Sequence, residues 1–134
     1  MKKIEHIGIA VKDLQASNLL FEKLLGRPHY KIEEVASEGV ITSFFQTGES
    51  KVELLQSLTD DGPIARFLQK RGEGVHHIAF AVDDIRSEIE RLRKEGFEVL
   101  GEGPKRGADN KLVAFLHPKS SNGVLVELCQ DLKN

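Results

Sequence analysis

The sequence contains little sulfur and few large aromatic side chains: one cysteine, one methionine, one tyrosine and no tryptophan among 134 residues. Because Cys129 is the single cysteine, no disulfide can form within the chain, and a cytoplasmic location is the default expectation. Cys129 lies in an alternating apolar run in which no activating partner can be named. We therefore interpret it as a small core residue and not as a nucleophile.

Long apolar runs and an excess of one charge are also absent. The longest apolar stretches, 7–11 and 113–116, are far too short to cross a bilayer, and the start of the chain lacks the apolar core of a signal peptide. The 19 basic and 21 acidic residues leave a net charge of −2, which gives no reason to expect nucleic acid or an anionic membrane as a partner. The length allows one well-buried core and is too short for two domains of usual size.

What the sequence does contain is an internal repeat. Segment 6–14 recurs as segment 77–85, with five of the nine residues identical. Each copy is a strand-like run that ends in an aspartate, Asp13 or Asp84, able to cap a helix. A second matching pair, the sequence VEL at 52–54 and again at 126–128, closes each half. The chain is therefore predicted to be a duplication in which each half has the form βαβββ.

Apolar residues at helical spacing predict helices over about 14–25 and 85–95, each closed by a glycine, Gly26 or Gly96, in the left-handed conformation. A short linker helix is predicted over 63–70. Alternating segments predict the remaining strands: 30–35, 40–46, 51–56, 97–100, 112–117 and 124–130. We therefore expect an α+β fold in one domain, in which two modules bury their apolar faces together. The expected parts are module 1 at about 1–58, the linker helix at about 62–71 and module 2 at about 74–131.

Two histidines and two glutamates occupy equivalent positions of the repeat. His6 and His77 lie in the first strand of each half, and Glu53 and Glu127 lie in the last. A lone histidine in a strand is more often structural than a ligand, but pseudo-twofold packing of the halves would bring all four residues together. Because burying two carboxylates without a cation is very unfavourable, the set predicts a divalent metal. Imidazole and carboxylate suit zinc, cobalt, nickel, manganese or iron(II), and four protein ligands leave coordination positions open for a substrate.

The residues around these ligands resemble a known superfamily. HIGIAV from His6, VELL around Glu53, HIAF from His77 and VEL around Glu127 resemble the metal positions of the vicinal-oxygen-chelate superfamily, which includes glyoxalases and bleomycin-resistance proteins. Within it, the resemblance to methylmalonyl-CoA epimerases covers nearly the full length. It is carried by GPIARFL (62–68), RGEGVHHIAF (71–80) and FLHPKSSNGVLVEL (115–128). Glyoxalases usually have an Asp-Pro-Asp-Gly-Tyr turn before the last glutamate, and this chain does not.

The resemblance implies interconversion of (R)- and (S)-methylmalonyl-CoA by proton exchange at C2, through an enolate that the metal stabilises. It also implies an acyl-CoA substrate, a homodimer, and cobalt as the metal, with zinc, manganese or nickel also suited. Two other functions stay open. One is a glyoxalase-type lyase that acts on a glutathione hemithioacetal, and the other is a non-catalytic protein of the same fold that sequesters a ligand.

The implied reaction needs a base on each side of C2. Glu127, as a carboxylate beside the substrate, is expected to be the first. For the second, certain epimerases place a glutamate shortly after a Gly-Val pair, where this chain has Thr42, which cannot act as a base near neutral pH. Three alternatives stay open: Glu53 across the metal from Glu127, Glu34 or Glu38 from the segment before the third strand, or a metal-bound water. We favour Glu53.

The three phosphate groups of CoA are expected to meet cationic side chains at the mouth of the cavity. Four basic residues in the loops of the second half are candidates: Lys105, Arg106, Lys111 and Lys119. Solvated loop charges explain each of them equally well. Segment 103–107 is bounded by glycines, which predicts a mobile segment that closes over the substrate, although ordinary loop flexibility explains it as well.

Overall fold

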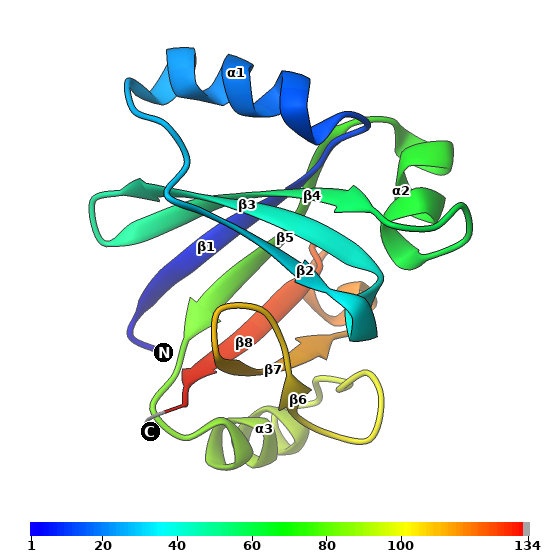
Figure 1. Cartoon of the computed structure of the whole chain (residues 1–134). Coiled ribbons are helices and arrows are strands. Elements are labelled where there is room, and N and C mark those ends of the chain that lie inside the picture. Colours follow the sequence, from blue (N-terminus) through cyan, green and yellow to red (C-terminus); the bar gives the residue numbers. More distant parts are fainter. Residues whose placement is uncertain (133–134) are drawn as a thin grey trace. The chain divides into compact units, whose positions relative to one another are not determined.

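The computed structural model describes residues 1–132 (Figure 1). The chain divides into two compact units, which we call the N-terminal unit (His6–His76) and the C-terminal unit (Met1–Glu5 with His77–Asn134). The element order is βαβββ in each half of the chain, joined by one helix, so the predicted α+β fold and its duplication are confirmed. None of the described helices is long and apolar enough to span a membrane.

The N-terminal unit is built on four strands in the order β2-β3-β4-β1. Strand β3 is antiparallel to both β2 and β4, and β1 runs parallel to β4. Helix α1 lies along one face of β3 and β4 (Figure 1), where Leu14 packs against Val11, Phe45 and Leu54. The elements are β1 (Lys3–Ala10), α1 (Leu14–Leu25), β2 (Lys31–Val35), the 3-10 helix η1 (Ala36–Glu38), β3 (Val40–Thr47), β4 (Ser50–Ser57) and α2 (Pro63–Arg71).

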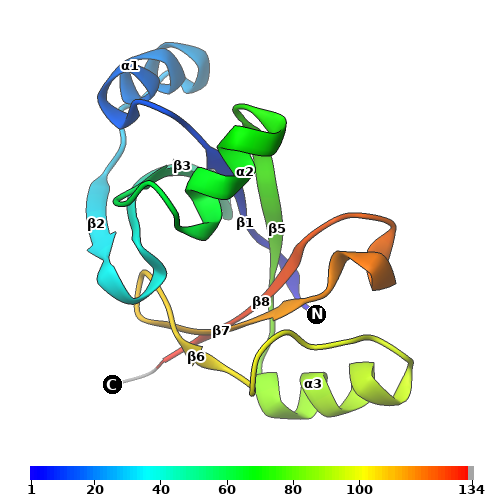
Figure 2. The ribbon, with the colours of Figure 1, turned by 90° about the vertical axis from the view of Figure 1, so that its right-hand side faces the viewer.

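The C-terminal unit repeats this arrangement with strands in the order β5-β8-β7-β6. Strand β5 is parallel to β8, and β7 is antiparallel to both β8 and β6. Helix α3 lies along β7 and β8 (Figure 2), where Ile85, Ile89 and Leu92 pack against Leu116 and Leu128. The elements are β5 (Gly74–Ala81), α3 (Ile85–Lys94), β6 (Lys105–Arg106), β7 (Lys111–Leu116), the 3-10 helix η2 (Pro118–Ser121) and β8 (Val126–Asp131).

The two predicted helix caps are confirmed. The Asp13 carboxylate accepts a hydrogen bond from the backbone N–H of Ala16 at 3.1 Å, and the Asp84 carboxylate accepts one from Ser87 at 3.2 Å. These bonds satisfy backbone donors that have no partner within the first turn of a helix. Gly26 closes α1 in the left-handed conformation with φ of 80°, as predicted.

One predicted strand is wrong. Residues 97–100 form no strand, and Val99 makes only an isolated bridge with Leu116. The alternation was a true signal of burial, because Phe97 and Val99 both pack against the core under α3. Gly101 and Gly103, with φ of 71° and 135°, keep the extended run from continuing past this segment. The sixth strand is instead the short β6, inside the segment 103–107 that was predicted to be a mobile loop.

Candidate metal centre

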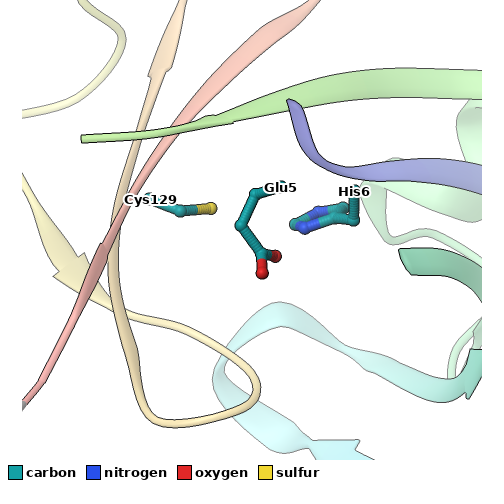
Figure 3. Close-up of side chains that lie close together, drawn as sticks. All are labelled: Glu5, His6 and Cys129. Atoms are coloured by element: carbon teal, nitrogen blue, oxygen red, sulfur yellow. The ribbon is translucent and has the colours of Figure 1, made fainter. Parts of the chain in front are cut away.

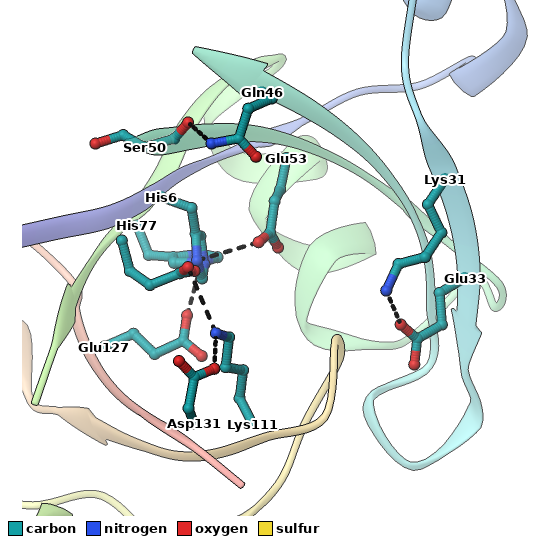
Figure 4. A network of polar contacts seen from close by, with 11 residues as sticks. His6, Lys31, Glu33, Gln46, Ser50, Glu53, His77, Lys111, Glu127 and Asp131 are labelled. Atoms are coloured by element: carbon teal, nitrogen blue, oxygen red, sulfur yellow. Dashed lines mark hydrogen bonds and ion pairs between the residues drawn. The ribbon is translucent and has the colours of Figure 1, made fainter. Parts of the chain in front are cut away.

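The N-terminal unit holds the first histidine–glutamate pair. Strands β1 and β4 are parallel, and their register sets Glu53 opposite Gly8, two residues beyond His6. His6 Nδ1 lies 3.1 Å from Glu53 Oε2 (Figure 4), and each side chain is only 6% exposed.

The C-terminal unit holds the second pair in the same arrangement. Strands β5 and β8 are parallel, and Glu127 lies opposite Ala79, again two residues beyond the histidine, His77. His77 Nε2 lies 2.9 Å from Glu127 Oε1 (Figure 4), and both side chains are buried. The ring of Phe115, which lies opposite Glu127 on β7, meets the His77 ring edge-on at 5.7 Å and fixes its orientation. The duplication therefore extends from the sequence to the register and burial of the pair, although the carboxylate faces Nδ1 in His6 and Nε2 in His77.

Each pair offers an imidazole nitrogen and a carboxylate oxygen within hydrogen-bonding distance and shielded from water. A buried carboxylate needs a cation or several hydrogen bonds to offset its desolvation. Neutral imidazole and carboxylate are the donors that zinc, cobalt, nickel and manganese accept. The residues present therefore fit a divalent ion.

One carboxylate that the sequence analysis missed lies on the sheet face that carries Glu53, which we call the Glu53 face. The register puts Phe44 opposite Glu53 and puts Thr42 opposite Glu33 on β2. Because side chains alternate along a strand, Glu33 shares the Glu53 face and Glu34, opposite Ile41, lies on the other face. Of the glutamates considered before the third strand, Glu34 is therefore directed away from this face. The signal was the pairing register, which the sequence alone does not display.

A second carboxylate that the sequence analysis missed is Glu5, which is buried in the C-terminal unit. Its Oε2 lies 3.7 Å from Lys111 Nζ, and Lys111 also forms an ion pair with Asp131. Figure 3 shows the Glu5 carboxylate beside the sulfur of Cys129. Cys129 is buried against Ala79 and Val113, which confirms its assignment to the core.

The four cationic candidates for CoA phosphates differ in their surroundings. Lys105 and Arg106 form β6 and are exposed. Lys119 is also exposed, and its ammonium, 3.0 Å from Glu98, holds the pKa of that carboxyl below its ordinary value. Lys111 is different, because its side chain is only 11% exposed and already faces two carboxylates. Its charge is therefore largely satisfied within the protein.

Comparison with known proteins shows which families and structures the chain resembles. The family model of the Glyoxalase/Bleomycin resistance protein/Dioxygenase superfamily matches residues 5–115. An ethylmalonyl-CoA/methylmalonyl-CoA epimerase of Cereibacter sphaeroides is 42% identical over 130 residues, which are 96% of this chain and 97% of that protein. A methylmalonyl-CoA epimerase of Streptomyces coelicolor, solved in complex with 2-nitronate-propionyl-CoA, superposes with a TM-score of 0.92 at 34% identity, over 99% of each chain. The lactoylglutathione lyase of Escherichia coli O157:H7 is 26% identical over 96% of this chain and 93% of that protein.

Proposed function

This chain belongs to the glyoxalase/bleomycin resistance protein/dioxygenase superfamily and, within it, to the methylmalonyl-CoA epimerases, and we propose that it exchanges the C2 proton of methylmalonyl-CoA. The epimerase assignment takes precedence over the lyase because identity is 42% to the epimerase and 26% to the lyase, each over nearly the whole chain. The observation that carries the proposal is the buried histidine–glutamate pair, repeated in the same register in each half.

We propose that His6, Glu53, His77 and Glu127 hold one divalent ion. The family supports a divalent metal, and imidazole and carboxylate are donors that such an ion accepts. Cobalt is our first choice, and zinc, manganese and nickel accept the same ligands. When bound, the ion supplies positive charge that stabilises the enolate oxygen during proton exchange.

Two carboxylates are proposed to move the proton at C2. Glu127 serves one face of C2 and Glu53 the other: the glutamate that is a carboxylate removes the proton from its face, and the other, as a carboxylic acid, donates a proton to the opposite face. Each histidine orients its glutamate. Its imidazole nitrogen lies about 3 Å from one carboxylate oxygen, and this contact fixes the direction of the other oxygen. Burial of both side chains excludes bulk water, which protects the enolate from uncontrolled protonation.

The CoA part of the substrate is proposed to meet the exposed cations Lys105, Arg106 and Lys119 through its phosphates. Lys111 keeps only a minor part in this proposal, since Glu5 and Asp131 already neutralise it. A homodimer and a cytoplasmic location stay predictions, and light scattering of the purified protein tests the first.

The decisive experiment compares two reactions on the same purified, cobalt-loaded protein. We expect deuterium from solvent to enter C2 of methylmalonyl-CoA rapidly, and no S-lactoylglutathione to form from methylglyoxal and glutathione. Deuterium uptake no faster than in the absence of protein would reject the epimerase. A protein that binds neither cobalt nor zinc and is inert in both assays would instead be a ligand-sequestering member of the superfamily.

A further inference from the structure

The Glu53 face contains a buried hydroxyl with no hydrogen-bond partner. Thr42, in the middle of β3, is 1% exposed, and its Oγ1 has no partner among the described residues. A buried polar atom without a partner is destabilising, and proteins keep few of them. A group that arrives with a ligand would satisfy such an atom, provided that the atom faces the site where the ligand binds.

The position of Thr42 relates this hydroxyl to the proposed reaction centre. Thr42 is two residues from Phe44, which lies directly opposite Glu53 in the β3–β4 ladder. Since residues i and i+2 share one face of a strand, Thr42, Phe44 and Glu53 all point to the same side of the sheet. The α-carbons of diagonal neighbours in such a ladder, here Thr42 and Glu53, lie about 7–8 Å apart, and a small head group can span that distance.

The side chains that flank Thr42 on β2 are long and partly exposed, so they can rotate to make room. Glu33, directly opposite Thr42, and Lys31, opposite Phe44, pair with each other at 3.5 Å and are each more than a third exposed. Figure 4 shows both extending from β2 to the side of the sheet where Glu53 lies. Lys31 Nζ also lies 4.7 Å from the centre of the Phe44 ring. A ligand seated at Glu53 therefore reaches Thr42 by displacing flexible side chains and leaving the backbone in place.

We propose that Thr42 is a substrate-positioning residue whose hydroxyl donates a hydrogen bond to an oxygen of the methylmalonyl head group. The inference rests on the proposed function and deepens it. The methylmalonyl head group carries carboxylate and thioester oxygens, all of them acceptors, and a threonine hydroxyl is a donor that can rotate to meet one of them. A bond to this head group orients C2 relative to the carboxylate of Glu53. Thr42 takes no proton itself.

The neighbouring residue provides a matched control within the same strand. Ser43 is fully buried and its Oγ also lacks a partner among the described residues, but it shares the opposite face with Phe45, under α1. Removing either hydroxyl removes a buried polar atom that has no partner among the described residues. Only Thr42 lies on the face that carries Glu53, so only Thr42 should affect ligand binding.

The test uses the cobalt-loaded full chain and three variants: T42V, which is nearly isosteric, T42S, which keeps the hydroxyl, and S43A. The probe is 2-nitronate-propionyl-CoA, whose head group resembles that of the substrate, with free CoA as a probe that lacks a head group. We expect T42V to weaken binding of the nitronate probe about tenfold, the loss of one hydrogen bond to a charged acceptor. Affinity for CoA stays unchanged, T42S retains most of the affinity, and S43A binds like wild type.

A second readout separates positioning from a structural role. In the ligand-free protein T42V should raise Tm by a few degrees, since it removes an unpaired buried hydroxyl without changing shape. A higher Tm together with weaker nitronate binding identifies a group kept for the ligand. Nitronate affinity equal to wild type in T42V, or an equal fall in CoA affinity, overturns the inference. If wild type itself neither binds the nitronate nor exchanges deuterium, the proposed function fails first.

Discussion

The residues that define this site are two glutamates placed where carboxylates are costly. Glu53 and Glu127 are each about 5% exposed, and each has an imidazole nitrogen as a close neighbour. An imidazole alone compensates such a carboxylate only if it is protonated. A divalent ion held by these side chains would compensate the buried carboxylates. The proposed exchange then needs one glutamate as the carboxylate that removes the C2 proton and the other as the carboxylic acid that protonates the opposite face.

The proton-transfer role of Glu53 is tested by replacing it with glutamine. E53Q keeps a ligand oxygen and so should retain the metal, but an amide cannot accept a proton at neutral pH. We expect deuterium exchange to slow by at least a hundredfold when it starts from one of the two methylmalonyl-CoA epimers and to change little from the other. Exchange is followed separately on each epimer, with cobalt content measured for every variant.

Glu33 is the control for that experiment, because it is the second carboxylate on the Glu53 face. We expect E33Q to keep both exchange rates. If E33Q and not E53Q slows one rate, the second base lies on β2 and Glu53 is a metal ligand only. E34Q, on the opposite face of β2, completes the set with a neighbouring glutamate that should have no effect on either rate.

At the scale of elements, a hydrogen bond in each half joins the start of the helix to the end of the last strand. The side-chain oxygen of Gln56 accepts a hydrogen bond from the Leu14 N–H at 2.6 Å, and Gln130 does the same for the Ile85 N–H at 2.8 Å. These donors lie in the first turn of α1 and α3, where no backbone acceptor is within reach. Since β4 and β8 also carry Glu53 and Glu127, the glutamine links helix, strand and ligand in both halves.

This link predicts a stability difference between two substitutions at Gln56. Q56M removes the acceptor with little change of volume and leaves the Leu14 N–H part-buried without its partner, so we expect a loss of about 1–2 kcal/mol in the free energy of unfolding. Q56E keeps an acceptor and adds negative charge near the positive end of the helix dipole, so its stability should be close to that of wild type. Urea unfolding measures both. Equal stability of Q56M and wild type would contradict the role assigned to this hydrogen bond.

An element could be predicted from the sequence where its apolar residues recur at a regular spacing and a capping residue marks its end. Helix α1 begins after Asp13 and ends at Leu25 before Gly26, as its cap and apolar stripe indicate. Segment 97–100 lacked such a boundary, and its apolar residues turned out to pack under α3 without joining a ladder. Alternation reports which side chains are buried, and it does not report whether the pairing with a neighbouring strand continues beyond a single bridge.

At the scale of the whole molecule, duplication is what made the candidate ligands predictable. Four residues in two related segments could be compared within one sequence, and both pairs prove to have the same register and burial. Glu33 and Thr42 could not be assigned to a face in this way, because they have no counterpart in the repeat and their orientation depends on how β2 and β3 pair. Local patterns therefore predicted which histidines and glutamates are equivalent, and they did not predict on which face the surrounding side chains lie.

The duplication leaves two stoichiometries to be distinguished, one ion shared by both pairs or one ion for each pair. The proposed function requires a shared ion: two protein ligands would leave a divalent metal mostly hydrated, whereas four would give the tight binding expected of a resident cofactor. Wild type should then bind one ion per chain and gain about 2.7 kcal/mol of stability at a metal concentration one hundred times Kd. H6A and H77A, in different halves, should each lose the ion and the whole gain.

The control for this prediction is H117N, which changes a histidine outside the two pairs. His117 Nδ1 accepts a hydrogen bond from the Lys119 N–H at 3.1 Å, and the asparagine oxygen can accept the same bond. Metal content by mass spectrometry and Tm with and without metal give two independent readouts for each variant. Two independent sites would give two ions per chain in wild type and one in each histidine variant, with about half of the stability gain kept. That result would reject a shared ion, and with it the arrangement in which Glu53 and Glu127 serve opposite faces of one substrate.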